Sequence, residues 1–364
     1  MSLQIGIVGL PNAGKSTLFN ALTESSKAAA ENFPFCTIEP NSGLVPIKDQ
    51  RLEQIAQIAN AAKVIPETIE FVDIAGLVEG ASKGEGLGNK FLSHIRQTNS
   101  ILLVLRFFEE KEVIHHLGAK NPKRDKEILE TELILKDLQT LEKSLEKIKK
   151  EAKSGDKEKI KQVELLENIK QNLNSGKKIS SLNLNQEEQA KIANLHLLTA
   201  KKFIFAANLS ENELVNFNEK AARQEIGLLD NEVLIPISAK IEAEIALLEK
   251  EEKEEFLKAL NLKQSGLEKL VLAAKEALNL ANFFTAGEKE TRAWTIVKNS
   301  TAPQAAGKIH TDFEKGFIKA DSVSWQDFIK FNGWSGCREK GLVQIVGKDH
   351  LVKDGEVLFF KFSS

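Results

Sequence analysis

The clearest chemical signal in the sequence lies in residues 9–17, which read GLPNAGKST. They contain the G-x-x-x-x-G-K-[ST] pattern of a phosphate-binding loop, and they stand between an apolar run at 3–8 and a helical pattern at 18–22. In such a loop the backbone N–H groups point at phosphate oxygens, and the dipole of the following helix adds attraction. We therefore expect a triphosphate to contact Asn12, Ala13, Gly14, Lys15, Ser16 and Thr17, with Lys15 on the β- and γ-phosphates and the Ser16 hydroxyl on Mg²⁺.

Further ligands for the metal and the γ-phosphate are predicted downstream of this loop. The strand pattern at 68–74 ends in a D-x-x-G sequence, which places Asp73 at the carboxyl end of a strand, where open α/β sheets bind ligands. Asp73 can hold Mg²⁺ through a water molecule, and the Gly76 N–H can meet the γ-phosphate. Thr37, in a proline-punctuated loop, can supply a second hydroxyl to Mg²⁺. The glycine-rich stretch 77–89 is predicted to be a mobile switch.

Two later strands predict where a nucleotide base binds. The strand patterns at 202–207 and 233–237 run into segments expected beside the phosphate loop, and the base-site residues predicted there are Asn208, Leu209, Glu211, Ser238 and Ala239. Guanine-specific proteins of this architecture carry N-K-x-D at the first segment, whereas here Leu209 replaces the lysine and Glu211 replaces the aspartate. Asn208 can still serve a purine N7. We therefore expect ATP to be preferred over GTP.

These segments require a largely parallel α/β sheet that is interrupted by helices. The continuous apolar run 101–105 is typical of a strand buried on both faces of such a sheet. From about 126, apolar residues recur at helical spacing with a break at 153–156, which predicts a hairpin of two long helices. The hairpin is an insertion, because sheet strands return at 202–207. From about 281, short strand patterns predict a separate, small β-rich unit.

Charged and aromatic residues outside these loops give weaker signals. The hairpin carries many lysines interleaved with glutamates, and a solvated face with i,i+4 ion pairs is favoured over a surface for RNA. In the C-terminal unit, Phe313 and Phe317 lie near Lys315 and Lys319 and can stack on RNA bases. Alternating aromatic residues more often pack in a core, and we favour that interpretation.

Composition indicates an ordinary globular protein of the reducing cytoplasm. The 364 residues are 42% hydrophobic and carry a net charge of −2, which excludes a protein that is basic throughout. The two cysteines, Cys36 and Cys337, form no C-x-x-C pattern, so a disulfide scaffold and a cysteine zinc site are not expected. The chain passes from Met1 and Ser2 into the first strand and has no apolar run of membrane-spanning length, so we expect no membrane insertion.

Taken together, these motifs resemble the YchF family, the Obg-like ATPases of the translation-factor class of phosphate-loop NTPases. The resemblance spans essentially the whole chain and rests on residues 9–17, 32–41, 73–88, 208–211 and 301–317. It implies ATP hydrolysis in preference to GTP hydrolysis, association with ribosomes, and a part in translation or the stress response.

The resemblance also implies a domain organisation. It predicts an OBG-type G domain at 1–125 and 201–280, a coiled-coil insertion at 126–200 and a ubiquitin-like (β-grasp) TGS domain at 281–364.

One position departs from many related GTPases. Leu77 follows the D-x-x-G motif, where those enzymes place a glutamine that orients the attacking water. We therefore expect a slow intrinsic rate. His115, in the loop after the strand at 101–105, is our hypothesis for the water-orienting residue, and an ordinary loop histidine is the alternative. Asn12 gives a second hypothesis, because an asparagine at this point of related phosphate loops can help to hold K⁺ against the phosphates.

The sequence thus predicts a Mg²⁺-dependent, ATP-hydrolysing switch. Its nucleotide state is expected to alter how the hairpin and the C-terminal domain meet a ribosome, a ribosomal subunit or RNA. The first alternative is a GTP-specific, translation-associated GTPase. The second alternative is a nucleotide-gated scaffold for RNA or protein in which hydrolysis is incidental.

Overall fold

The computed structural model describes residues 3–30, 41–74, 94–109 and 120–363. The chain divides into two compact units. The first unit holds Met1–Ser25, Ile38–Gly43 and Glu70–Leu270, and the second holds Ser26–Thr37, Leu44–Ile69 and Val271–Ser364.

The first unit is built on a six-stranded sheet whose strands follow the spatial order β2 (Ser42–Pro46), β4 (Thr68–Asp73), β1 (Leu3–Val8), β5 (Ser100–Arg106), β6 (Lys202–Asn208) and β7 (Val233–Ile237). Strands β1, β5, β6 and β7 pair in parallel. Strand β5 is buried along its whole length, which confirms the interpretation of its continuous apolar run. Because these four strands run in one direction, their carboxyl ends meet at one edge of the sheet.

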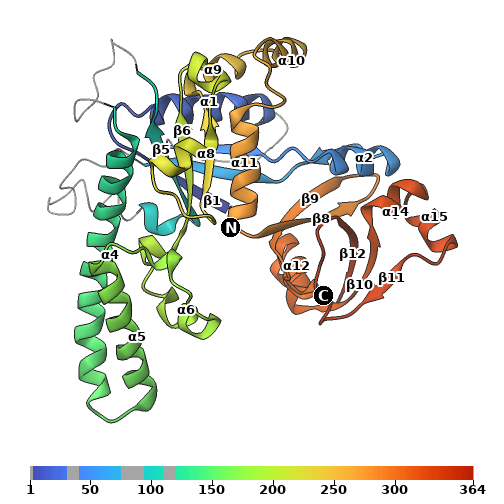
Figure 1. Ribbon diagram of the computed structural model, residues 1–364. Helices are drawn as coiled ribbons and strands as arrows, with labels where there is room; N and C mark the ends of the chain where they lie inside the picture. The colour runs from blue at the N-terminus through green and yellow to red at the C-terminus, as the bar shows by residue number, and fades with distance from the viewer. Residues whose placement is uncertain (1–2, 31–40, 75–93, 110–119, 364) are drawn as a thin grey trace. The chain divides into compact units, whose positions relative to one another are not determined.

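Helices connect these strands and form one long insertion. Figure 1 shows α4 and α5 side by side as a hairpin that extends from the sheet, which confirms the predicted pair of long helices. Helix α4 begins at Pro122, before the expected residue 126, because Asn121 caps it and proline suits the first turn. The helices and short 3₁₀ turns of this unit are α1 (Lys15–Ala30), α4 (Pro122–Ala152), α5 (Lys157–Asn174), η1 (Ile179–Ser181), α6 (Gln186–Ala193), η2 (Leu198–Ala200), α7 (Glu211–Val215), α8 (Glu219–Glu225), α9 (Ala239–Ile245), α10 (Lys250–Ala259) and α11 (Gly266–Ala277), of which α1 and α11 end within residues assigned to the second unit.

The hairpin has its own apolar core and an ionic anchor at its base. Leucine and isoleucine side chains such as Leu145 and Ile169 are buried between α4 and α5. At the base, the Lys178 side chain is only 7% exposed and pairs with Glu130 of α4 and with Glu232, just before β7. Because Glu130 and Glu232 are only 14% and 11% exposed, these two ion pairs are largely shielded from water and connect the hairpin to the sheet.

The second unit is built on another six-stranded sheet. Strands β8 and β12 pair in parallel at its centre, and antiparallel neighbours flank them, in agreement with the expected β-grasp arrangement. Figure 1 shows this sheet as strongly curved. In spatial order its strands are β11 (Gln344–Val346), β10 (Phe317–Ser324), β12 (Glu356–Phe362), β8 (Leu280–Ala286), β9 (Thr291–Val297) and β3 (Val64–Ile65).

Helices cover both faces of this second sheet. One face packs against α12 (Ala302–Ile309), and Phe317 and Phe360 belong to the core on that side, so Phe317 packs in a core as we favoured. The other face packs against α2 (Gln50–Ile58) and α14 (Trp325–Lys330). The remaining helices of the unit are α13 (Thr311–Lys315) and α15 (Gly333–Glu339).

Between β2 and β4 the chain leaves the first sheet, and residues 47–67 group with the C-terminal residues. Strand β3 pairs in parallel with β9, and α2 buries Leu52 and Ile55 in the same core as Phe284 and Phe328. The cause is therefore a pairing between segments far apart in the sequence, which no local pattern reveals.

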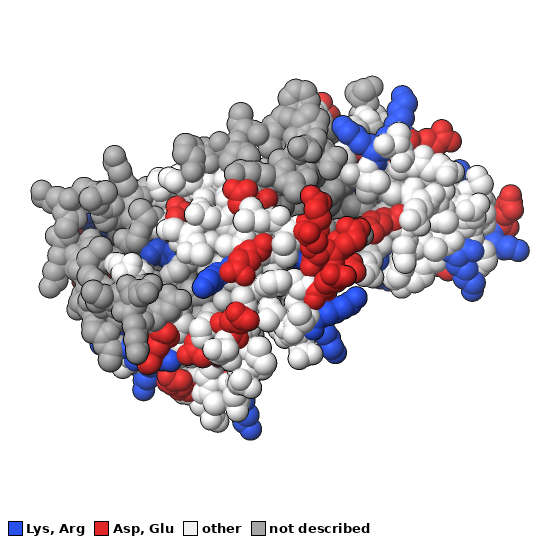
Figure 2. Space-filling model, turned by 90° about the horizontal axis from the view of Figure 1, so that it is seen from above, with Lys and Arg blue, Asp and Glu red and all other residues white. Residues whose placement is uncertain are grey.

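Surface charge is unevenly distributed over the first unit. Helix α10 exposes Glu251, Glu252, Glu254 and Glu255. Figure 2 shows acidic side chains gathered on the face that carries this helix. Such a surface repels phosphate groups, so it is unsuited to contact with nucleic acid. Within the described ranges, no helix combines the length and the apolar character that crossing a membrane requires.

Candidate functional site

The predicted phosphate loop lies between β1 and α1, as its motif requires. Strand β1 ends at Val8 and α1 begins at Lys15. Gly14 has a φ of 92°, and a Cβ at this position would come within 2.1 Å of the Asn208 Nδ2 atom. Gly9 is equally constrained, since its Cβ would meet the Val104 carbonyl oxygen at 2.7 Å. Both glycines therefore allow the close backbone approaches that shape the loop.

A buried lysine and a half-buried aspartate interact electrostatically beside the loop. The Lys15 side chain is 8% exposed, and its Nζ donates a hydrogen bond to the Leu10 carbonyl oxygen at 2.9 Å. Burial lowers the pKa of Lys15, and the charge of Asp73 opposes this shift. Burial likewise raises the pKa of Asp73, and the charge of Lys15 opposes it. Both charged forms have thus lost hydration that a triphosphate with its metal ion can replace.

The donor set around Asp73 fits Mg²⁺. Its Oδ1 atom is buried and has no hydrogen-bond partner among the residues that the structure describes. Such an orphaned carboxylate oxygen suits a water molecule of a magnesium shell. Ser16 is exposed on the first turn of α1, where its hydroxyl can reach a ligand.

The described part of the chain contains no metal site formed by protein side chains alone. No group of three or more His, Cys, Asp or Glu side chains there is placed to hold a metal ion.

Asn208, at the end of β6, braces the phosphate loop. It is 4% exposed, and its Nδ2 donates to the Ala13 carbonyl oxygen at 2.9 Å. Its Oδ1 accepts a hydrogen bond from the Ala239 N–H at 3.0 Å. The sequence predicted contact with a purine N7, whereas the structure uses both ends of the amide to join the loop to the start of α9. One amide hydrogen remains for a purine.

A cavity of about 500 Å³ opens beside the loop. This volume lies within the usual range for sites that bind small molecules. It brings phosphate-loop residues and predicted base-site residues together at the carboxyl edge of the sheet, and its lining includes Asn12, Gly14, Thr17, Asn208, Leu209, Glu211, Ser238 and Ala239. The structure thus places in one cavity two groups of residues that are almost two hundred positions apart.

The base side of the cavity is held by the first turn of α7. Glu213 accepts hydrogen bonds from the Ser210 N–H at 3.0 Å and the Ser210 hydroxyl at 2.6 Å. Lys120, just before α4, pairs with Glu213 at 3.4 Å and donates to the Phe107 carbonyl oxygen at 2.8 Å. The side chain of Glu211 is exposed and makes no ion pair with any described residue. It is therefore available to a ligand in the cavity.

Several lining residues were missed from the sequence, namely Phe108, Asn212, Lys240, Ile241 and Glu244. Phe108 follows β5, and the Arg106 guanidinium lies over its ring at 4.5 Å from the centroid. Its place after a buried parallel strand was a signal that could have identified it. The others follow directly on the predicted base-site segments.

Some predicted site residues lie outside the described residues. These are Thr37, Gly76 and His115, together with Leu77 and the predicted switch at 77–89.

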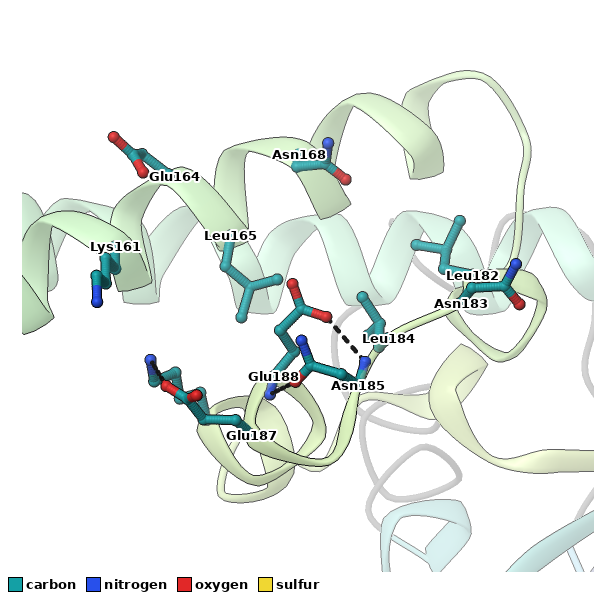
Figure 3. A pocket seen from close by; sticks show the side chains of 11 residues that line it. Lys161, Glu164, Leu165, Asn168, Leu182, Asn183, Leu184, Asn185, Glu187 and Glu188 are labelled. Carbon is teal, nitrogen blue, oxygen red and sulfur yellow. Dashed lines mark hydrogen bonds and ion pairs between the residues drawn. The ribbon is translucent and has the colours of Figure 1, made fainter.

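A second cavity, of about 610 Å³, lies between α5 and α6. Figure 3 shows its lining, in which Asn185 and Glu188 bond each other's backbone as a helix cap. Lys191 is paired with Glu187 at 2.6 Å. No phosphate-loop residue lines this cavity. Its polar groups serve the local fold, so the cavity beside the loop is the candidate nucleotide site.

Comparisons with known proteins agree with this geometry. A family model described as "50S ribosome-binding GTPase" matches residues 4–208, and the YchF-GTPase C-terminal model, described as "Protein of unknown function", matches residues 280–363. The chain is 49% identical to "Ribosome-binding ATPase YchF" of Escherichia coli O157:H7 over 363 residues, and 46% identical to the protein of that name from Bacillus subtilis over 366 residues. Both alignments cover 100% of each chain.

A solved structure with the same fold also matches the whole chain. The structure described as "Structure of the Schizosaccharomyces pombe YchF GTPase" matches with a TM-score of 0.88 and 36% identity. The match covers 99% of this chain and 98% of that one.

Proposed function

The chain belongs to the YchF family, and from this premise we propose that it is a P-loop ATPase that binds ribosomes and switches with its nucleotide state. One observation carries the proposal. The phosphate loop and the segment after β6 line a single cavity of nucleotide size, beside the buried Lys15 and the half-buried Asp73, whose buried Oδ1 has no hydrogen-bond partner among the described residues.

The loop residues bind and orient the triphosphate. Backbone N–H groups from Ala13 to Thr17 surround the phosphate oxygens, and the Lys15 ammonium neutralises the β- and γ-phosphates. The Ser16 hydroxyl and, through water, the Asp73 carboxylate would hold Mg²⁺, which would supply positive charge to offset the negative charge that develops during transfer. Asn208 keeps the loop in its binding shape by its bond to the Ala13 carbonyl oxygen. Positioning and electrostatics thus supply the catalysis.

Adenine is the base that we propose for the cavity. Guanine readers use an aspartate to accept from N1–H and the N2 amino group, but this chain has the longer Glu211 at that point and Leu209 instead of a lysine. Leu209 is 5% exposed and its N–H is bonded to the Ile237 carbonyl oxygen at 2.8 Å, so it offers the base an apolar wall. Adenine, which lacks the N2 donor, fits this lining better.

The main alternative is a GTPase. The description of the Schizosaccharomyces pombe relative and that of one family model both use the word GTPase, which favours this alternative. A competition titration discriminates between the two. With a fluorescent ATP analogue bound, unlabelled ATP is expected to displace the probe at lower concentration than GTP, whereas the reverse order would establish the GTPase.

The remaining catalytic roles rest on sequence and family resemblance. We propose that Thr37 completes the Mg²⁺ shell, that Gly76 meets the γ-phosphate and that His115 orients the attacking water. His115→Ala is expected to slow turnover, both basal and ribosome-stimulated, and unchanged turnover would eliminate it. We also propose that Asn12 helps to hold K⁺, which predicts faster turnover in K⁺ buffer than in Na⁺ buffer.

We propose ribosome binding through the coiled-coil insertion at 126–200 and the TGS domain at 281–364, with the G domain at 1–125 and 201–280 as the sensor, in the cytoplasm. Co-sedimentation with ribosomes is expected to differ between ATP-loaded and nucleotide-free protein. The competing model is a scaffold with incidental hydrolysis. A Lys15→Ala variant that keeps full biological activity would favour the scaffold.

A further inference from the structure

A cavity of about 440 Å³ lies at the edge of the first sheet where its parallel strands begin. Two segments line it, one directly before β5 and one between α6 and β6, and the lining residues are Arg96, Gln97, Thr98, Asn99, His196 and Lys201. The phosphate loop follows the other end of β1, at the carboxyl edge. Because β5 has 7 residues that rise about 3.3 Å each, roughly 20 Å separates the two edges. The cavity is therefore distinct from the nucleotide site.

Arg96 leaves most of its hydrogen-bond donors unused. Its Nη2 donates to the Thr140 hydroxyl of α4 at 2.8 Å. Its Nε is buried and has no partner among the described residues, and no described carboxylate forms an ion pair with the guanidinium. A guanidinium is always charged, and its planar fork of N–H groups matches two oxygens of one phosphate. Arg96 is therefore equipped to bind an anion.

Lys201, directly before β6, supplies a second cation. Its Nζ donates to the Arg96 carbonyl oxygen at 3.1 Å and to the Thr98 carbonyl oxygen. An ammonium group has three N–H donors, so one remains for a ligand. Burial lowers the pKa of Lys201, and the charge of Asp137 opposes this shift. Lys15 of the phosphate loop is in the same condition, because its ammonium bonds a carbonyl oxygen and burial lowers its pKa.

Positive charge exceeds negative charge around this cavity, among the residues that the structure describes. Neither aspartate nor glutamate occurs in the lining. Asp137 lies close enough to affect Arg96 and Lys201, but both of its carboxylate oxygens accept hydrogen bonds from η2. Lys136 of α4 adds to the excess, since burial lowers its pKa and the charge of Arg96 lowers it further. An anion in the cavity would relieve this repulsion.

We propose that this cavity, which we call the basic cavity and define by its six lining residues, binds the terminal phosphate group of a small phosphorylated molecule. Arg96 and Lys201 supply the charge, and the His196 ring and the Asn99 amide supply further hydrogen bonds. The Asn99 Oδ1 accepts from the Gln4 N–H at 2.9 Å, so the Nδ2 group remains for the ligand. This site is independent of the proposed ATPase activity, because none of its residues lines the nucleotide cavity.

The size and the charge of the basic cavity favour a small molecule over nucleic acid. Its volume lies within the usual range for sites that bind small ligands. A nucleic-acid backbone presents singly charged diesters along an extended chain and is bound by cations spread along it. A terminal phosphate carries a charge of about −1.5 to −2 at neutral pH and has three free oxygens. It therefore gains more from two cations that line one cavity.

The test measures binding of inorganic phosphate and of pyrophosphate by isothermal titration calorimetry at constant ionic strength. The parent protein is full-length Lys15→Met, in which the phosphate loop lacks its main cation. We expect a saturable heat with both probes and tighter binding of pyrophosphate, which carries more charge. Dimethyl phosphate, a singly charged diester, represents the backbone of nucleic acid. It is expected to bind more weakly than either probe.

Two neighbouring lysines provide a matched pair of variants in this parent. Lys201→Gln is expected to weaken pyrophosphate binding about ten- to hundred-fold, as the loss of one hydrogen bond to a charged group does. Lys202→Gln removes the same charge from the next residue, which is exposed and lies outside the lining. We expect Lys202→Gln to bind pyrophosphate as the parent does.

Arg96 is tested in the same way against its contact with α4. Arg96→Gln is expected to lose about as much affinity as Lys201→Gln, because it too removes a cation. Thr140→Val removes the hydroxyl that accepts from Arg96 but keeps the guanidinium, so its affinity should stay close to that of the parent.

Urea denaturation adds a second readout. Because pyrophosphate binds the folded state, it is expected to raise the urea midpoint of the parent and of Lys202→Gln but not that of Lys201→Gln. The shift is measured within each variant, so a loss of stability caused by the substitution itself does not affect the comparison.

Any of three results would contradict an anion site in the basic cavity for small phosphorylated molecules. The first is a parent protein that gives no saturable heat with either probe. The second is equal affinity in Lys201→Gln and Lys202→Gln, or in Arg96→Gln and Thr140→Val. The third is dimethyl phosphate that binds as tightly as inorganic phosphate, which would assign the cavity to a nucleic-acid backbone instead.

Discussion

The phosphate-loop corner of the first unit and the Arg51 network of the second both shield charged side chains at least partly from water, but the two regions provide these charges with different partners. Beside the loop, Lys15 bonds a single carbonyl oxygen, and Asp73 keeps an oxygen without a partner among the described residues. In the second unit, Arg51 bonds Asp49 at 2.7 Å and Asp354 at 2.6 Å.

The carboxylates of the Arg51 network have further donors as well. Asn282, which is 1% exposed, donates its side-chain amide to Asp49 at 3.2 Å and its backbone N–H to Asp354 at 2.7 Å. The difference between the regions teaches how to separate a binding site from a structural network. Buried charges with internal partners stabilise the fold, whereas buried charges that still lack a partner are prepared for a ligand.

Lys15→Met should produce the largest effect in the loop corner. Nucleotide turnover is expected to fall at least about 100-fold, as when a single electrostatic donor is removed from an active site. The free energy of unfolding is expected to change by no more than about 1 kcal/mol, because the lost hydrogen bond is offset by relief of the buried charge. Steady-state kinetics and urea denaturation measure the two quantities. Substantial destabilisation would mean that Lys15 is structural and would remove the contrast.

Arg51→Met is the matched change in the network and should show the reverse pattern. It leaves the half-buried Asp49 without its cation, while the exposed Asp354 keeps Lys275 as a partner, so the free energy of unfolding is expected to fall by only about 1–2 kcal/mol. Turnover per folded molecule should stay at the wild-type value. Hydrogen exchange of the amides in β8 and β12 locates the loss in the second unit. A variant of unchanged stability but reduced turnover would contradict this assignment.

The same substitution at two buried asparagines sharpens the comparison. Asn208→Asp replaces the donor to the Ala13 carbonyl oxygen by a second acceptor, so ATP affinity is expected to fall by about tenfold, or about 1.4 kcal/mol. Asn282→Asp instead places a carboxylate next to Asp49, which should lower stability and leave ATP affinity unchanged. Calorimetric titration and thermal melting separate the outcomes. If both variants lose mainly affinity, the two regions do not differ as we describe.

Lowering the pH should have the smallest effect of these changes on the free energy of unfolding. Burial alone would raise the pKa values of Asp49 and Asp354. The hydrogen bonds and the charge of Arg51, with other donors nearby, outweigh burial and hold the pKa of each carboxyl below its usual value. Their contribution to stability is therefore complete above the unfolded pKa of about 3.9 and is lost as the pH falls through the folded values. Burial raises the pKa of Glu67, so its contribution to stability changes with pH in the opposite direction. Because Glu67 is present in both the wild type and Arg51→Met, its contribution cancels when the two are compared.

The difference in stability between the wild type and Arg51→Met isolates the contribution of Asp49 and Asp354. Between about pH 6 and pH 3, the stability advantage of the wild type over Arg51→Met should shrink, because both carboxyls become protonated. A pH series of urea midpoints checks it. An advantage that stays constant over this range would show that Arg51 acts by packing rather than by charge.

The features that the sequence predicted correctly depend on residues that are close together in the chain. The strand and helix on either side of residues 9–17, the buried run of β5 and the break between α4 and α5 follow from local patterns, and the structure confirms these elements. The sequence did not reveal the pairing of β3 with β9, because their partners lie far apart in the chain. The hydrogen bonds by which Asn208 holds the phosphate loop were not predicted either, for a related reason. Its amide meets Ala13 and Ala239 only after three separate segments have folded to one sheet edge.

Isothermal titration of ATP, in the presence of Mg²⁺, into the wild type and Lys15→Met tests the central claim most directly. We predict a saturable heat of binding for the wild type and its loss in Lys15→Met, while Arg51→Met binds as the wild type does. Equal heats for wild type and Lys15→Met, or no heat for the wild type with either ATP or GTP, would contradict the account.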